Sequence, residues 1–230
     1  AASIQVDVST GQGSYAGTAA PAHDQGLLGA GDTTWNAVDG DTSSGLFFTD
    51  GSAASGVSVD FGTAAGTGKV NWSNTLGGTT GNGTGSGFYD TALMQDWGFT
   101  TDDDALGVRV QGLAAGAYSV FAITREHNAT GRTYDVGLGV DTDNTTAIGD
   151  LTITGIAAGA PSSWVAGKNY ATTQVNVNST SDSVVMIVDP TNERFGTLQG
   201  FQIVAVPEPS SSAVLLGFSA LALVFLRRRR

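Results

Sequence analysis

Short segments in which apolar and polar residues alternate recur along this chain of 230 residues. Residues 4–8 and 57–61 show the alternation without a break. A period of two places successive side chains on opposite faces of an extended strand, so one face can be buried while the other meets water. The 33 glycines and the many Thr, Ser, Asn and Asp residues between these segments favour turns and disfavour long helices. The pattern predicts an all-β fold built from short strands.

About eleven strands are expected. They are residues 4–8, 33–38, 46–48, 57–61, 106–113, 117–124, 134–140, 151–156, 170–177, 184–188 and 198–206. A tight turn at 114–116 is expected to join its two neighbouring strands as a hairpin. The glycine-rich stretch 62–87 is expected to be a long surface loop, and 88–97 to form one or two helical turns. Many short strands with turns between them indicate one antiparallel, jelly-roll-like β-sandwich.

The last two dozen residues differ from everything before them. Pro207, Glu208 and Pro209 end the last expected strand, because proline cannot donate to a β-ladder. Residues 213–226 are apolar except for one serine. This run predicts a single C-terminal transmembrane helix, at the short limit for crossing a bilayer. The alternative is a buried core helix with a charged tip, which a run that is apolar on every side disfavours.

The apolar run ends in a cluster of four basic residues, Arg227, Arg228, Arg229 and Arg230. Basic residues beside a membrane span stay in the cytoplasm, so the folded body at 1–206 is expected outside the inner membrane. The chain starts at Ala1 without an initiator methionine. Removal of a signal peptide is expected to have produced this start, although an artificial boundary would look the same.

The order of a Pro-Glu-Pro triplet at 207–209, a short apolar helix at 213–226 and an arginine cluster at 227–230 resembles the PEP-CTERM sorting signal of exopolysaccharide-producing Gram-negative bacteria. The resemblance covers roughly the last 25 residues, which form a sorting and anchor segment at 207–230. It implies processing near the triplet by a membrane protease-transpeptidase, an exosortase. It also implies a transient anchor in the inner membrane, followed by release to, or attachment at, the cell surface or extracellular matrix.

A second resemblance covers the body of the chain. The phrases at 113–120, 134–136 and 198–204, together with Arg125, look like the jelly-roll domains often found before this tail. Those domains resemble galactose-binding-like carbohydrate modules. The resemblance implies a sandwich that could bind polysaccharide, although such phrases are also ordinary hairpin sequence.

The charge of the body limits its partners. The whole chain has 10 basic and 21 acidic residues, and the tail accounts for four arginines and Glu208, which leaves 6 basic and 20 acidic residues, a net charge of −14. Such a body repels nucleic acid and anionic membrane, so neither is an expected partner. The chain has no cysteine, which excludes disulfides, thiol catalysis and Cys-based zinc sites.

Catalytic motifs are missing from the sequence, and the protein is expected not to be an enzyme. Neither histidine sits in a nucleophile motif, although Arg125 and His127 form a polar cluster after a strand that could contact a ligand. The body has only two glutamates, Glu126 and Glu193. This scarcity disfavours glycoside hydrolysis, but paired carboxylates need only two acids, and with twenty acids in the body they stay open as an alternative.

Acidic loops offer hard oxygen ligands of the kind that calcium prefers. The candidates are Asp102, Asp103 and Asp104 in one loop, with Asp141 and Asp143 in another. Neither loop completes the calcium motif of an EF-hand, and an acidic turn-forming surface is the alternative. No cofactor is required by the sequence, and calcium is the one candidate.

Sugar binding would need exposed aromatic side chains beside hydrogen-bonding groups. Trp35, Trp72, Trp97 and Trp164 are candidates, and Trp72 has the most polar neighbours, in Asn-Trp-Ser-Asn. Packing inside the fold is the alternative for each tryptophan. The leading hypothesis is a surface-sorted structural or adhesive protein of the bacterial extracellular matrix, which contacts polysaccharide or like molecules weakly and at many points. A carbohydrate-binding module with a defined sugar site and a surface polysaccharide hydrolase are the alternatives.

Overall fold

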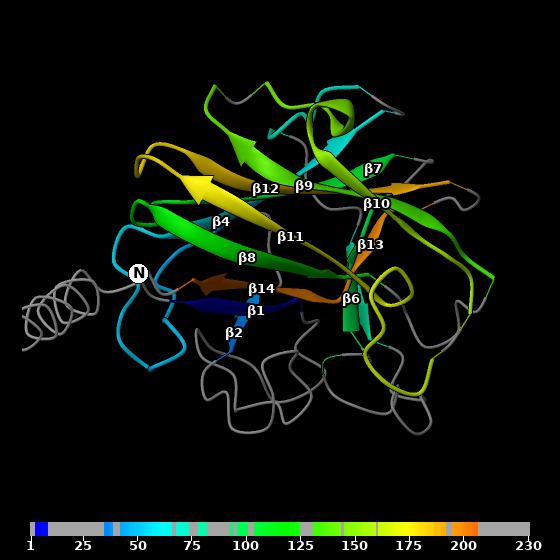
Figure 1. The fold of residues 1–230 in the computed structure, drawn as a ribbon, viewed down its shortest axis with the longest axis horizontal. Helices are drawn as coiled ribbons and strands as arrows, with labels where there is room; N and C mark the ends of the chain where they lie inside the picture. Colours follow the sequence, from blue (N-terminus) through cyan, green and yellow to red (C-terminus); the bar gives the residue numbers. More distant parts are fainter. Residues whose placement is uncertain are drawn as a thin grey trace, which may run out of the picture.

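Two β-sheets packed face to face make up the body of this computed structural model (Figure 1). The structure describes residues 3–8, 35–38, 42–65, 68–73, 78–81, 93, 96–100, 104–124, 131–143, 145–159, 161–191 and 195–206. Its strands are β1 (Ile4–Val8), β2 (Asn36–Val38), β3 (Thr42–Ser43), β4 (Ser58–Ala64), β5 (Gly78–Gly81), β6 (Asp96–Phe99), β7 (Ala105–Gln111), β8 (Gly116–Ile123), β9 (Tyr134–Asp141), β10 (Thr152–Ile156), β11 (Tyr170–Val177), β12 (Ser183–Pro190), β13 (Thr197–Leu198) and β14 (Gly200–Ala205). One 3-10 helix, η2, spans Ile148–Asp150.

The first sheet has five strands in the order β11-β8-β14-β1-β2, and the second has six in the order β10-β9-β12-β7-β4-β3. A small sheet, β13-β6-β5, lies beside them. This arrangement confirms the predicted all-β sandwich. The predicted antiparallel pairing holds for the other paired strands but is wrong for β1 and β2, which run parallel. The jelly-roll connectivity stays a prediction.

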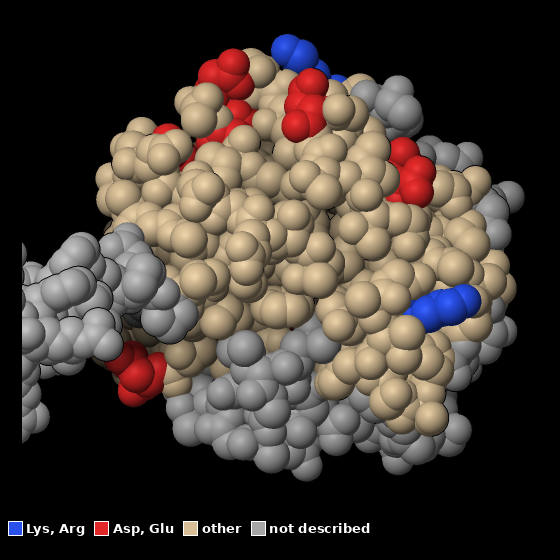
Figure 2. Space-filling view, in the orientation of Figure 1, with Lys and Arg blue, Asp and Glu red and all other residues tan. Residues whose placement is uncertain are grey.

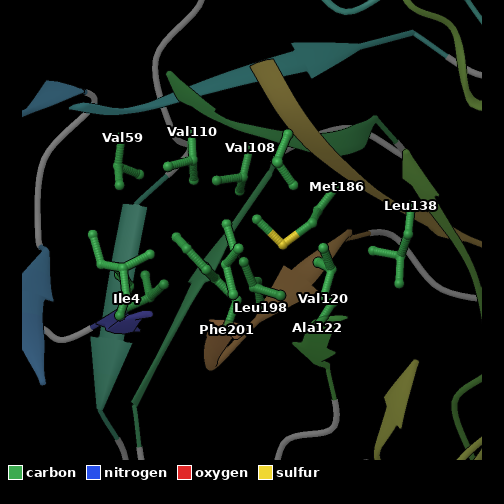
Figure 3. Packing of buried hydrophobic residues seen from close by; sticks show 14 of the residues in the cluster. Ile4, Val59, Val108, Val110, Val120, Ala122, Leu138, Met186, Leu198 and Phe201 are labelled. Carbon is green, nitrogen blue, oxygen red and sulfur yellow. The ribbon is translucent and has the colours of Figure 1, made fainter. Parts of the chain in front are cut away.

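The core between the sheets is built by the alternation seen in the sequence. On β1, Ile4, Val6 and Val8 point inward, and on β8 Val120 and Ala122 do the same. Figure 3 shows Ile4, Val120 and Ala122 on one side of this core, with Val108, Met186 and Leu138 of the facing sheet on the other. Each fully buried aliphatic side chain contributes about 1.5–3 kcal/mol relative to exposure. This shared apolar layer therefore holds the two sheets together.

The expected hairpin between 106–113 and 117–124 is wrong, because the chain crosses from one sheet to the other at this point. Both edges of β7 are taken, by β4 and β12, and both edges of β8 by β11 and β14. The Tyr118 hydroxyl donates to the carbonyl oxygen of Ala114 at 2.8 Å and stabilises the connection between β7 and β8. Gly112 has a φ of 81°, and an added Cβ would lie 1.9 Å from the carbonyl oxygen of Gly56, so only glycine fits there.

Three further expectations also need correction. Residues 46–48 form only an isolated antiparallel bridge, between Phe47 and Ala53, and the backbone of Phe47 bonds on its other side to the side chain of Asn36, at 2.7 and 2.9 Å. The stretch 62–87 is not one loop, since β4 continues through it to Ala64 and β5 lies within it. Trp97 lies in β6 rather than in a helical turn, and of 88–95 the structure describes Leu93 alone, as helical.

A row of glycines lets a covering layer lie directly on the outer face of the six-stranded sheet. Gly62 and Gly107 stand opposite each other on β4 and β7, and Gly137 lies in the same cross-strand row on β9, beyond Ile187 of β12. A Cβ added at Gly107 would lie 2.6 Å from Cγ1 of Val70, which belongs to the covering segment 68–73. That segment pairs with a second one, through the backbone bond from Val70 to Thr146 at 3.3 Å. The two segments and the sheet enclose a second small apolar cluster.

The variant Gly107→Ala should therefore destabilise the protein. The added methyl group has to displace Val70 from a packed site, which should lower the free energy of unfolding by about 1–3 kcal/mol. Urea unfolding followed by tryptophan fluorescence measures the difference.

Gly149→Ala is the matched control for this substitution, because a Cβ there meets nothing within 4 Å. It should leave stability unchanged or raise it by less than about 1 kcal/mol. Equal stability of the two variants would show that the covering segment does not lie on the glycine row.

Candidate functional site

The sorting segment follows directly after β14, the last strand of the sandwich. Among the described residues, no linker separates the two. Strand β14 ends at Ala205, whose backbone N–H donates to the Ser3 hydroxyl at 3.0 Å. The N–H of Val206 still donates to Ala117 of β8, at 2.9 Å. Pro207, Glu208, Pro209 and the cluster from Arg227 to Arg230 lie outside the described residues, so the transmembrane helix stays a prediction. Within the part of the chain that is described, no helix is long and apolar enough to cross a membrane.

Asp141 and Asp143, two of the predicted calcium ligands, accept hydrogen bonds within the turns in which they lie. The carboxylate of Asp141 accepts the N–H of Asp143 at 2.8 Å and that of Thr146 at 3.3 Å. The carboxylate of Asp143 accepts the N–H and the hydroxyl of Thr145, at 3.1 and 2.6 Å. An aspartate that closes its own turn in this way explains the loop without a metal.

The other proposed calcium ligands do not complete a site among the described residues. Asp104 uses its carbonyl oxygen to accept the Thr100 hydroxyl at 2.5 Å. Asp102 and Asp103 lie outside the described residues. Where the structure is described, no three acidic or histidine side chains come together as a metal site would need. A calcium site stays a prediction.

Trp72 sits in a packed position rather than on an open surface. Its ring lies against the Gly62–Gly107 pair, and the guanidinium group of Arg109 lies over the ring, 4.8 Å from the centroid. Arg109 is held there by Asp60, its cross-strand partner, with nitrogen–oxygen distances of 2.6 and 2.8 Å. A ring with these neighbours pins the covering segment to the sheet. Arg125 and His127, the other two predicted ligand contacts, lie outside the described residues.

Two acidic side chains meet on the outer face of the six-stranded sheet, and sequence reasoning missed them. Asp135 on β9 and Asp189 on β12 are direct cross-strand partners and both are half-buried. Burial first, and then the charge of Asp135, raise the pKa of Asp189 above its usual value. Each aspartate stands between apolar neighbours in its strand, but only the register of the strands brings the two together.

An aromatic group on the outer face of the five-stranded sheet is the second feature that the sequence did not single out. The rings of Phe121 and Tyr170 have centroids 6.1 Å apart, and those of Trp164 and Tyr170 lie 6.2 Å apart in an edge-to-face arrangement. All three are half-buried. Trp164 was one of four candidate tryptophans, but its sequence neighbours gave no sign that Tyr170 and Phe121 would join it. Of the described tryptophans, it is the one grouped with other half-buried rings beside exposed amides.

Residues 205–230 match the model of the PEP-CTERM protein-sorting motif. The chain carries a PEP-CTERM sorting motif. The match begins at Ala205, the last residue of β14, so sorting signal and sandwich are continuous. The motif confirms the resemblance drawn from the tail, and it marks an exported protein that an exosortase-type enzyme sorts to the cell surface. No curated protein matches the chain.

The sandwich is similar in fold to parts of several solved carbohydrate-active proteins. A calcium-binding mutant of Bacteroides uniformis β-glucuronidase 2 is 10% identical with a TM-score of 0.46, over 89% of this chain and 18% of that one. The family 35 module (CBM35) of Cellvibrio japonicus Abf62 is 10% identical (TM-score 0.33, covering 65% and 94%). The family 35 carbohydrate-binding module of Clostridium thermocellum is 13% identical (TM-score 0.32, covering 64% and 92%). This chain spans less than a fifth of the β-glucuronidase, and the likeness concerns the fold alone.

The facing aspartates predict a pH-dependent weakness in the sandwich. Because the pKa of Asp189 is raised in the folded state, the native protein binds this proton more readily than the unfolded chain does. Stability should therefore fall as the pH rises from the ordinary pKa of an aspartate through the raised one. Asp189→Asn should be more stable than the parent at pH 7 by about 0.2–1 kcal/mol, with no difference near pH 3. Urea unfolding at the two pH values measures this.

Asp135→Asn serves as the companion variant, since removing either charge relieves the same repulsion. The double variant should gain no more than Asp189→Asn alone, because the burial cost of the Asp189 carboxylate remains in Asp135→Asn. A loss of stability in Asp189→Asn at pH 7 would contradict the repulsion and show that the pair is held by a favourable contact.

Proposed function

We propose that this chain is a structural or adhesive protein of the bacterial extracellular matrix, presented at the cell surface and acting by contact rather than by catalysis. The observation that carries the proposal is the match of residues 205–230 to the PEP-CTERM protein-sorting motif. The route runs through the inner membrane, where the apolar run at 213–226 is a temporary anchor, to the surface. The sandwich is then the part that meets the matrix, on the outer side of the membrane.

The use that the body makes of its acidic residues supports a structural role. Asp50, Asp141, Asp143, Asp150 and Asp182 all accept hydrogen bonds from nearby backbone N–H groups. Asp60 pairs with Arg109. These carboxylates hold turns and strands together, so much of the negative charge is part of the scaffold.

A groove lies at one end of the six-stranded sheet, beside β3 and the start of β4. It has a volume of about 400 Å³ and lies between residues 44–46 and 53–58. Its lining consists of Ser, Gly, Ala, Leu and Val, which offer no group suited to proton transfer near neutral pH. The hydrolase alternative would have to rest on Glu126 and Glu193, which lie outside the described residues.

A carbohydrate-binding module is the second candidate, and the group of Phe121, Trp164 and Tyr170 favours it. Half-buried rings beside uncharged hydrogen-bonding side chains are typical of sites for small polar ligands and sugars. The two candidates differ in whether one defined site carries the contact with the matrix.

The proposed route is tested by removing the anchor. A chain that lacks residues 213–230, expressed in a host with an exosortase-type enzyme, should appear in the periplasm or the medium. The apolar run and the arginines that would hold it in the membrane are then absent. Cell fractionation with immunoblotting measures the distribution.

Glu208→Ala is the control, because it alters the Pro-Glu-Pro triplet and keeps the apolar run. It should accumulate in the membrane fraction at full length, unprocessed. Membrane retention of the truncated chain would overturn the anchor.

A further inference from the structure

The outer face of the five-stranded sheet has a covered half and an open half. Over β14 and β1, the side chains of Gln202, Gln5 and Asp7 are completely buried. Over β11, the outward side chains of Thr172, Gln174 and Asn176 are exposed. The register continues this contrast across the sheet, since Thr172 stands beside Phe121 and Phe121 beside Gln202. The open half therefore begins where the buried part of the face ends.

Aromatic rings mark the boundary between the two halves. Tyr170 continues the outward row of β11, and Phe121 lies on the neighbouring strand β8. Trp164 packs edge-to-face on Tyr170, and both contact the buried cluster formed by Trp35, Leu93 and Ile123. The three rings thus have one side anchored in the fold, while part of each remains accessible.

The loop that carries Trp164 is fixed by a buried amide. The side chain of Asn169, completely buried, accepts the N–H of Val165 and donates to the carbonyl oxygen of Ser163, both at 2.9 Å. The backbone carbonyl oxygen of Asn169 accepts the N–H of Thr124, which directly follows β8, at 3.4 Å. The position of the indole is set before any ligand arrives, which lowers the entropy cost of binding.

The open half is uncharged, in contrast to the rest of the body. In Figure 2 the centre of the surface over β8 and β11 consists of uncharged residues, and charged side chains, acidic and basic, lie toward its margin. A body with a net charge of −14 repels anionic polymers, and nothing at the centre of this face offsets that repulsion. A neutral polymer meets no such penalty.

We propose that the open half of this face binds a strand of a neutral polysaccharide. The site consists of Phe121, Trp164, Tyr170, Thr172, Gln174 and Asn176, which we call the neutral platform. It rests on the proposed function at the cell surface and adds to it a place and a class of ligand.

Each part of the neutral platform has a role in this contact. The accessible parts of the rings pack against the apolar C–H face of a sugar. The side chains of Thr172, Gln174 and Asn176 offer both donors and acceptors to its hydroxyl groups. They are spaced two residues apart on β11, so the row extends over about 13 Å at roughly 3.3 Å per residue. A row of this length contacts a chain of linked sugars better than a single one.

Affinity electrophoresis of the full chain tests the platform. The gels contain dextran, galactomannan or mixed-linkage β-glucan as neutral probes and polygalacturonate as an anionic one. A polyoxyethylene detergent keeps the chain soluble, because detergents with sugar head groups would compete. At least one neutral probe should retard the parent chain, and polygalacturonate should not.

Two platform variants should weaken the retardation. Trp164→Ala removes one ring and should raise the apparent Kd at least about threefold. Gln174→Glu changes an exposed side chain, so it tests the platform even if the tryptophan variant folds poorly. It should weaken binding by a similar factor.

Matched controls separate the platform from general effects. Trp72→Ala removes a half-buried tryptophan from the segment that covers the six-stranded sheet. It should lower the Tm without changing the retardation. Ser55→Glu adds the same charge as Gln174→Glu, but on an exposed turn outside the platform. It should change neither the Tm nor the retardation.

The outcomes distinguish the site from the proposed function. If the parent binds a neutral probe and both platform variants bind it equally well, the platform is overturned while matrix contact stands. If no probe retards the parent but the tail still sorts it to the surface, polysaccharide contact and the platform both fail. Concentration-dependent dimers in sedimentation that Gln174→Glu abolishes would make the face an interface between copies, and would also overturn the glycan site.

Discussion

The six-stranded sheet buries both faces of its inner strands β12, β7 and β4 over most of their length, and the rest of the structure depends on this. Its inner face meets the five-stranded sheet across the main core, and its outer face is closed by segments 68–73 and 145–151. The second closure is possible because Gly62, Gly107 and Gly137 remove side chains where the cover has to lie. Each glycine costs strand stability, and burial of Val70 and Ile148 offsets that cost. Among the described residues, the open half of the five-stranded sheet has no such row of glycines, so a ligand can reach the outer face of that half.

Charge is distributed according to the same division. Aspartates such as Asp141 and Asp60 stabilise a turn or pair with Arg109, and the facing pair Asp135 and Asp189 lies on the six-stranded sheet. The open half of the other sheet carries hydroxyl and amide groups instead. Acidic residues elsewhere on the surface can keep the protein soluble while the open half of the five-stranded sheet stays neutral. This separation is what makes a neutral matrix polymer the better fit than an anionic one.

The sorting motif and the sandwich are joined at a fixed point. Strand β14 is central in its sheet, between β8 and β1, and the motif begins at its last residue. A central strand is difficult to pull out of a sheet, because it is bonded along both edges. The backbone is therefore held in the sheet up to the residue at which the sorting motif begins.

The sequence by itself determined the fold class, most of the strands and the destination of the chain. Alternation is local, so segments such as 4–8 and 170–177 appear in the structure with the predicted bounds. The tail is a linear signal, readable without a fold, and its motif was found in the same way.

Only the tertiary structure decided which strands pair and which faces are covered. Residues 106–113 and 117–124 look like a hairpin, yet partners far along the chain occupy all their edges. Trp72 has the more polar neighbours in sequence and is packed under Arg109, whereas Trp164 stands beside an open row of amides. The physical reason is the same in each case: pairing and burial are set by contacts between distant segments, and a local pattern gives the direction of a side chain but not what it meets.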